Sequence, residues 1–175
     1  NIRKERVFMS VFENTVMVNR RPSYGQLFLK YLCFVVTVFF AMGIIVISPM
    51  LFFLPTIIMA FLTYQANASC SLEYEYTYID GELDIAKIKA KRKRKELAQV
   101  DLDNLILIAP KGSGELNAYH NDKDTKILDA TSKRPDHKVY EVVYRKNSSQ
   151  FIIYFEPDEN LLNLIRTKYM SKVIL

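Results

Sequence analysis

LFLKYLCFVVTVFFAMGIIVISPMLFFLPTIIMAFLTY, residues 27–64, is a run of 38 residues with a single charged side chain, Lys30, near its start. A soluble domain does not bury so long an apolar stretch, so we expect it in a membrane. At about 1.5 Å per residue, one helix of this length would be nearly twice as long as the roughly 30 Å hydrocarbon core. Two shorter helices fit, and Ser48-Pro49 provides a hinge in the middle of the run, with Pro55 soon after. The run therefore predicts a transmembrane helical hairpin.

The two helices of this hairpin have recognisable ends. Ser23 and Gln26 have the spacing of a capping box, which places the start of the first helix at about residue 24 and its end near residue 47. The second helix is expected over about residues 50–65, where Tyr64 is a suitable interfacial anchor. Together they define a hairpin segment over residues 23–66.

The first 22 residues suggest a different kind of helix. Val7, Phe8, Val11, Phe12 and Val16 lie close to helical spacing, and basic residues flank them on both sides. We expect residues 1–22 to form an amphipathic helix that lies on the membrane surface. The alternative is that the same helix packs on the protein's own domain or on a partner.

The distribution of positive charge predicts the orientation. The hairpin turn, around residues 47–55, contains no Lys or Arg, whereas Arg20, Arg21 and Lys30 precede the hairpin and further basic residues follow it. The positive-inside rule then places both termini in the cytoplasm. We expect a multi-pass protein of the inner (plasma) membrane, whose first span acts as its own signal anchor.

From residue 71 onward the apolar period changes to two. Tyr74, Tyr76 and Tyr78 alternate with Glu and Thr, which predicts a strand whose tyrosines pack in a core, with a partner groove as the alternative. Asp80-Gly81 then signals a hairpin turn. Similar patterns predict strands at residues 82–91, 93–101, 105–109, 126–131, 138–145 and 150–155.

The last element has helical character. Asp158 and Glu159 suit a helix start, and Leu161, Leu162 and Ile165 begin an apolar stripe. Residues 71–175 are therefore expected to form a cytoplasmic pleckstrin-homology-like (PH-like) barrel of about seven antiparallel strands with a C-terminal capping helix. The whole chain is predicted to be a membrane-anchored α+β protein.

Three parts of this segment also carry a family resemblance. They are the tyrosine-rich strand Leu72–Tyr78, the Gly81–Ile85 turn and strand, and Leu105–Pro110 after a basic run. They resemble an uncharacterised family of small bacterial two-span membrane proteins, known mainly as a domain of unknown function. They also look like bacterial PH-like domains tethered behind a transmembrane hairpin. The resemblance implies a fold and a tether, and it implies no catalytic residues.

The basic run is the main candidate for a binding surface. On a strand, alternate lysines of this run would share one face and could meet anionic headgroups, at roughly 1 kcal/mol per side chain near the surface. The alternatives are a solvated strand face that protects a sheet edge, or a site for an acidic protein partner. The candidate lipid- or partner-binding residues are Lys87, Lys89, Lys91, Arg92, Lys93, Arg94, Lys95, Arg20 and Arg21.

Other kinds of site are not indicated. The net charge of +5 is modest, and no aromatic residues interleave with the basic run, so we expect no nucleic-acid partner. Cys33 and Cys70 lack the company of metal ligands, and residues 121–124 are better explained as a turn than as a calcium loop. We expect no catalytic residues, no cofactor and no metal.

These observations favour a non-enzymatic, membrane-anchored binding or scaffold module. Its PH-like domain would contact a protein partner, anionic lipid of the bilayer, or both. The alternative is an accessory subunit of a larger integral membrane complex, in which the spans pack on other helices through small residues such as Gly43 and Ala60. The sequence carries no signal for an oligomeric state.

Overall fold

The computed structural model describes residues 13–121, 124–147 and 149–175. The chain divides into two compact units. One unit contains Arg21–Leu72 together with Lys89–Lys93. The other contains the described residues up to Arg20, Glu73–Ile88 and Arg94–Leu175. We call them the hairpin unit and the sheet unit.

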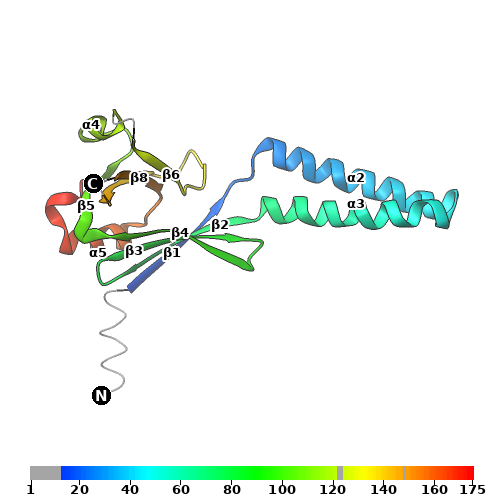
Figure 1. Cartoon of the computed structure of the whole chain (residues 1–175), viewed down its shortest axis with the longest axis horizontal. Coiled ribbons are helices and arrows are strands. Elements are labelled where there is room, and N and C mark those ends of the chain that lie inside the picture. Colours follow the sequence, from blue (N-terminus) through cyan, green and yellow to red (C-terminus); the bar gives the residue numbers. More distant parts are fainter. Residues whose placement is uncertain (1–12, 122–123, 148) are drawn as a thin grey trace, which may run out of the picture. The chain divides into compact units, whose positions relative to one another are not determined.

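The hairpin unit is built from two long helices, α2 (Tyr24–Val46) and α3 (Pro49–Cys70), which run side by side (Figure 1). The expected capping box is present, since the Ser23 N–H donates to Gln26 Oε1 at 2.9 Å. Pro49 occupies the first turn of α3, where its missing N–H leaves no intrahelical bond unmade. Both expected helices are therefore confirmed, although α3 continues five residues beyond the expected end at residue 65.

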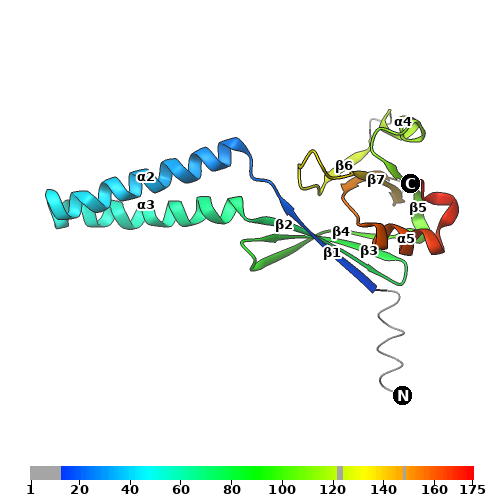
Figure 2. The ribbon, with the colours of Figure 1, turned by 180° about the vertical axis from the view of Figure 1, so that it is seen from behind.

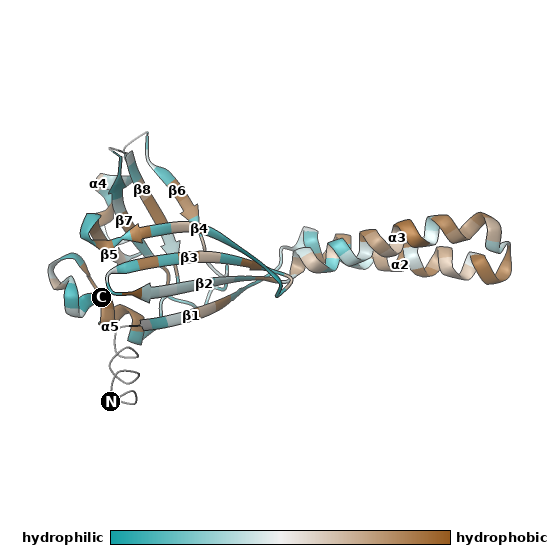
Figure 3. Cartoon of the chain, turned by 60° about the horizontal axis from the view of Figure 1, so that its bottom comes forward, coloured by the Kyte–Doolittle hydropathy of each residue, from teal (hydrophilic) through white to brown (hydrophobic). Residues whose placement is uncertain are grey.

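Small and polar side chains hold the two helices together. The Thr37 and Thr63 hydroxyls lie 2.8 Å apart across the helix pair. Gly43 is buried against the ring of Phe52, and a Cβ atom on Gly43 would lie only 2.5 Å from Phe52 Cδ1. Most of the remaining large apolar side chains of α2 and α3 are exposed, and Figure 3 shows the apolar character along the pair.

The first sheet of the sheet unit has the strand order β1-β2-β3-β4 (Figures 1 and 2). Its strands are β1 (Glu13–Arg20), β2 (Leu72–Ile79), β3 (Glu82–Lys89) and β4 (Lys93–Asp101). The tyrosines of β2 are buried, which confirms that they pack in the core. Asp80 and Gly81, both with positive φ, form the expected turn between β2 and β3.

The amphipathic helix expected over residues 1–22 is wrong over residues 13–20, which form strand β1. Residues 13–20 are extended, and residues 1–12 lie outside the described part of the chain. Val16 and Val18 are at least partly buried while Thr15 and Met17 are exposed, which is the period of two of a strand. Branched valines at alternate positions favour a pleated surface over a helix. The helical spacing that suggested otherwise came mostly from residues before position 13.

The position of β1 changes the domain boundaries. Because β1 pairs with β2, the helical hairpin is an insertion between two neighbouring strands of one domain. The sheet unit therefore does not begin after the hairpin, as the expected boundary at residue 71 assumed. It begins before the hairpin and resumes after it.

The second sheet has the order β5-β7-β8-β6. It contains β5 (Leu105–Pro110), β6 (Lys126–Asp129), β7 (Tyr140–Lys146) and β8 (Ser149–Phe155). Strands β5, β7 and β8 pair antiparallel, but β6 pairs parallel with β8, in the register Lys126 with Phe151 through Asp129 with Tyr154. The expectation of an all-antiparallel barrel is therefore wrong at β6, because a long connection containing β7 lets the chain return in the same direction.

Short helices connect and close the sheets. They are η1 (Leu102–Asn104), η2 (Gly114–Leu116), α4 (Asn117–His120), α5 (Glu159–Lys168) and η3 (Met170–Lys172). As expected, α5 is amphipathic and buries Leu161, Leu162 and Ile165. The Asp158 side chain caps its start by accepting from the Leu161 N–H at 2.7 Å.

The core lies between the two sheets and is rich in aromatic rings. Tyr76 of β2 meets Phe155 of β8 edge to face, with ring centroids 5.7 Å apart. The Tyr76 hydroxyl donates to the Ala130 carbonyl at 2.5 Å, and burial raises its pKa above the usual value. This pair therefore joins the two sheets by both apolar and polar contacts.

Candidate functional site

The basic run forms a turn rather than one continuous strand. Strand β3 ends at Lys89, and β4 begins at Lys93. Ala90 and Lys91 both have left-handed backbone, with φ of 53° and 54°, and the Arg92 N–H donates to the Lys89 carbonyl at 3.2 Å. The expectation that the lysines share the face of a single strand is therefore wrong, because the chain reverses in the middle of the run. We call residues 87–95 the basic turn.

The centre of the basic turn belongs to the hairpin unit. The Ala90 N–H donates to the carbonyl of Ser71 at 2.8 Å, and Ser71 directly follows the last residue of α3. At the same end of the hairpin, Cys70 Sγ lies 3.7 Å from the Gln26 carbonyl near the start of α2. The centre of the basic turn, residues 89–93, is therefore fixed beside the end of the hairpin where the chain enters α2 and leaves α3.

The candidate cations are not equally available. Lys89, Lys91, Arg92, Lys93 and Lys95 are exposed, and Lys87 is half-buried. None of these six side chains forms an ion pair within the part of the chain that the structure describes.

Two of the candidate arginines contact other side chains of the protein. Arg94 Nε lies 2.6 Å from Glu75 Oε2, and Arg20 Nη1 donates to the Tyr74 hydroxyl at 2.8 Å. Arg21 is exposed and belongs to the hairpin unit. Arg21 therefore remains with the lysines as an available cation, whereas Arg20 and Arg94 mainly support the first sheet.

The charge of the basic turn is one-sided. Its nine residues contain seven Lys or Arg side chains and no acid. The carboxylates around it lie on the strands: Glu75 of β2 contacts Arg94, and Asp84 of β3 interacts with Glu96 and Arg94 of β4. Burial, together with Glu96 and Glu82, raises the pKa of Asp84 above its usual value. The tip is thus a concentrated positive charge, suited to anionic groups.

Two histidines contact buried carboxylates elsewhere. Glu156 is 5% exposed and accepts hydrogen bonds from the Ser132 N–H and hydroxyl, each at 2.9 Å, while His137 Nδ1 lies 2.8 Å from its other oxygen. The Ser132 hydroxyl is fully buried and donates to the carboxylate, so it is not poised as a nucleophile. His120 Nε2 similarly lies 2.7 Å from the buried Glu141. Both clusters are explained as structural pairs.

Among the residues with described positions, no three His, Cys, Asp or Glu side chains are grouped to hold a metal ion. In the turn expected over residues 121–124, residues 122 and 123 lie outside the described part of the chain, while Asn121 and Asp124 are in turns.

The contact between the basic turn and Ser71 could not be found from the sequence. Lysines alternate without interruption through residues 87–95, so the run itself gives no sign of the reversal that makes this contact.

The comparisons with known proteins give one finding. A family model described as "Bacterial PH-like domain (DUF6106)" matches residues 13–175. The match begins at the first residue of β1 and includes the helical hairpin, so the whole arrangement of strand, hairpin and sheets lies within it. No curated protein and no solved structure matches this chain.

Proposed function

The chain belongs to this bacterial PH-like family, and from that premise we propose that it is a membrane-anchored binding module whose basic turn contacts anionic lipid headgroups. The hairpin α2–α3 crosses the bilayer twice, and the sheet unit lies on the cytoplasmic side. PH-like domains are typically binding or scaffold modules, so the proposed activity is binding and not catalysis. The observation that carries the proposal is the hydrogen bond between Ala90 and Ser71 at the end of α3.

The case for a double crossing rests on length and exposure. Helices of 23 and 22 residues correspond to about 35 Å and 33 Å, enough to cross a hydrocarbon core of roughly 30 Å. Their large apolar side chains remain exposed in this chain; Phe28 is 70% exposed and Met50 is 95% exposed. The threonines satisfy their hydroxyls internally, as Thr37 and Thr56 each donate to a carbonyl one turn earlier at 2.7 Å. Lipid is the solvent that suits such a surface.

The case for a cytoplasmic domain rests on connectivity and charge. Strand β1 precedes the hairpin and β2 follows it, yet both belong to one sheet. Two crossings return the chain to the side from which it started, so this arrangement requires an even number of spans. The turn between the helices, residues 47–48, has no positive charge, whereas the opposite end of the hairpin carries Arg21 and the basic turn. The positive-inside rule places that end in the cytoplasm.

The case for lipid contact rests on position. Each Lys or Arg near an anionic surface contributes about 1 kcal/mol, and this contribution falls away within a Debye length of about 8–10 Å. The hydrogen bond from Ala90 to Ser71 holds the basic turn next to the last residue of a proposed span, within that range. The left-handed backbone at Ala90 and Lys91 makes a tight reversal that keeps the cations together.

The proposal is tested with the full chain in lipid nanodiscs, by hydrogen exchange of residues 87–95. Nanodiscs containing phosphatidylglycerol are compared with nanodiscs of phosphatidylcholine alone. We expect slower exchange in the anionic bilayer, a loss of this difference at high salt, and the same loss in the variant K89Q/K91Q/K93Q. The matched control K111Q/K138Q/R166Q removes three cations elsewhere and should keep the difference. Equal exchange of the unmodified turn in the two bilayers would overturn the proposal.

One argument for the alternative, an accessory subunit of a larger complex, does not hold. The close approach at Gly43 is already taken by Phe52 of the same hairpin, so this glycine does not offer a free surface to another span. Purification in mild detergent is the decisive observation. A stoichiometric membrane protein that remains bound would favour the accessory role over an independent module.

A further inference from the structure

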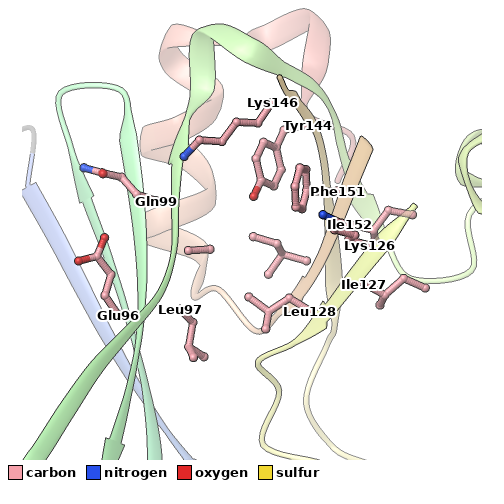
Figure 4. A pocket seen from close by; sticks show the side chains of 12 residues that line it. Glu96, Leu97, Gln99, Lys126, Ile127, Leu128, Tyr144, Lys146, Phe151 and Ile152 are labelled. Carbon is pink, nitrogen blue, oxygen red and sulfur yellow. The ribbon is translucent and has the colours of Figure 1, made fainter. Parts of the chain in front are cut away.

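A groove opens in the sheet unit between the free edges of its two sheets (Figure 4). Strand β4 is the last strand of the first sheet, and β6 is the last strand of the second. The groove between them has a volume of about 490 Å³. Residues 96–99 of β4 form one wall, residues 126–128 of β6 form the other, and side chains of β7 and β8 form the floor. We call it the edge groove.

The wall formed by β4 has unused hydrogen-bonding capacity. An edge strand pairs on one side only, and the backbone N–H and C=O groups of its other side remain open to a further strand. Among the described strands of the first sheet, β4 pairs only with β3. An extended chain entering the edge groove can therefore continue the sheet.

The floor is apolar and rigid. Tyr144 and Phe151 stack with ring centroids 5.2 Å apart and an angle of 20° between the rings. The neighbouring Ile152 is fully buried, and burial raises the pKa of Tyr144, so its hydroxyl stays neutral. On the β6 wall, Ile127 is 56% exposed. These surfaces suit apolar side chains of a bound segment.

The rim on the side of β6 and β7 is positive. Lys126 Nζ lies 5.5 Å from the centroid of Phe151, and Lys146 lines the groove on its other flank. Both lysines are exposed, and neither forms an ion pair with another residue of known placement in the structure. Two unpaired ammonium groups beside an apolar floor are complementary to carboxylates on an otherwise apolar segment.

We propose that the edge groove binds an extended segment of a partner protein, which adds a strand to β4. Its alternate side chains are aliphatic or aromatic and pack on Tyr144 and Phe151, and it carries Asp or Glu against Lys126 and Lys146. This goes beyond the proposed function, because the edge groove lies on the sheet unit and needs none of the cations of the basic turn. A lipid chain has no groups to pair with the edge of β4. A second copy of the folded chain is hindered by its own β6 wall, which flanks the edge it would have to present.

The test selects peptides from a random peptide display library against the full chain in detergent micelles. We expect enriched sequences that alternate apolar residues with Asp or Glu. Their affinity should fall about tenfold or more in K126E/K146E and stay unchanged in R134E/R166E, which makes the same change of charge on exposed residues elsewhere. Bound peptide should slow hydrogen exchange of residues 96–99, while the response of the basic turn to anionic lipid should be the same in K126E/K146E as in the unmodified chain.

Three outcomes would overturn the inference. The first is a selection that enriches no peptide for the unmodified chain over the K126E/K146E chain. The second is peptide binding that leaves the exchange of β4 unchanged. The third is a dimer, seen by sedimentation, in which residues 96–99 already exchange slowly without peptide. That result would mean that a second copy of the chain occupies the groove. Circular dichroism and melting of both double variants verify that they are folded, as expected for substitutions at exposed positions.

Discussion

Arg20 and Tyr74 are separated by 54 positions and the whole helical hairpin, yet Arg20 Nη1 donates to the Tyr74 hydroxyl at 2.8 Å. Further along the same strands, the Thr15 and Thr77 hydroxyls lie 3.4 Å apart. Later residues of β1 thus face earlier residues of β2, as in an antiparallel pair. The chain leaves the sheet for the hairpin and returns to the neighbouring strand.

This arrangement predicts that the hairpin can be excised. Joining Arg20 to Leu72 through a short Gly-Ser linker should give a soluble, folded sheet unit, because the linker connects neighbouring ends of β1 and β2. A chain that starts at residue 71 should fold poorly, because it lacks β1 and exposes the edge of β2. Cooperative urea unfolding of both shortened chains is the measurement. Equal stability of the two would contradict the role assigned to β1.

Strand β1 illustrates the limit of a local sequence pattern. Strand β2 could be predicted because its tyrosines alternate regularly with polar residues, and turns such as Asp80-Gly81 have a strong local signal. Strand β1 could not, because its pairing partner β2 lies beyond the hairpin. The apolar residues near the N-terminus fit a helical period and a strand period at once. Only the long-range pairing with β2 decides between them.

The candidate site shows a similar division. The composition of the basic turn was evident from the sequence, but its shape depended on where β3 ends, and a left-handed conformation at Ala90 and Lys91 has no strong residue signal. The edge groove could not be predicted. Its walls come from β4 and β6, which are the outer strands of different sheets, and the parallel pairing of β6 with β8 is invisible in a local pattern.

Within the hairpin, Gly43 is predicted to be required for close helix packing. In Gly43→Val, the new side chain would overlap the Phe52 ring and separate α2 from α3, so the detergent-solubilised hairpin should become more sensitive to proteolysis. The compensating change Phe52→Ala should restore much of the resistance in the double variant. Additive effects of the two substitutions would show that the contact is not the cause.

Glu156 is predicted to stabilise the loop that follows β6. Its carboxylate accepts two hydrogen bonds from Ser132 and contacts His137, so Glu156→Leu should leave buried donors without partners and reduce the free energy of unfolding by about 1–3 kcal/mol. Urea denaturation of the full chain in detergent measures the loss. The exposed Glu159, the first residue of α5, supplies the control Glu159→Gln, which should change stability little. An equal loss in the two variants would contradict this role.

Asp129 is predicted to contribute stability that is lost in acid. Burial opposes its ionised form, but hydrogen bonds from Lys133 and Thr131 outweigh burial and lower its pKa below the usual value. The ionised group therefore stabilises the fold above pH of about 4, and the contribution disappears as the pH falls through the lower folded pKa. Asp129→Asn should lower the melting temperature at neutral pH and narrow the difference from the parent chain below pH of about 4. A constant difference across this range would contradict the assignment.

Asp84 is predicted to behave in the opposite way. Its Oδ1 is buried without a hydrogen-bond partner among the described residues, and burial with the nearby Glu96 and Glu82 raises its pKa. Folding therefore disfavours the ionised form of Asp84. Its ionisation lowers the stability of the fold at pH values above the folded pKa, and this loss disappears as the pH falls toward the unfolded pKa of about 3.9. Asp84→Asn should raise the melting temperature at neutral pH. The corresponding gain in the free energy of unfolding should be less than about 1 kcal/mol, because the group is partly solvated. The gain should shrink on acidification, and Glu73→Gln on the neighbouring strand β2 serves as the control. A variant that melts lower than the parent at neutral pH would show that the Asp84 carboxylate supports the sheet through contacts that outweigh its repulsion.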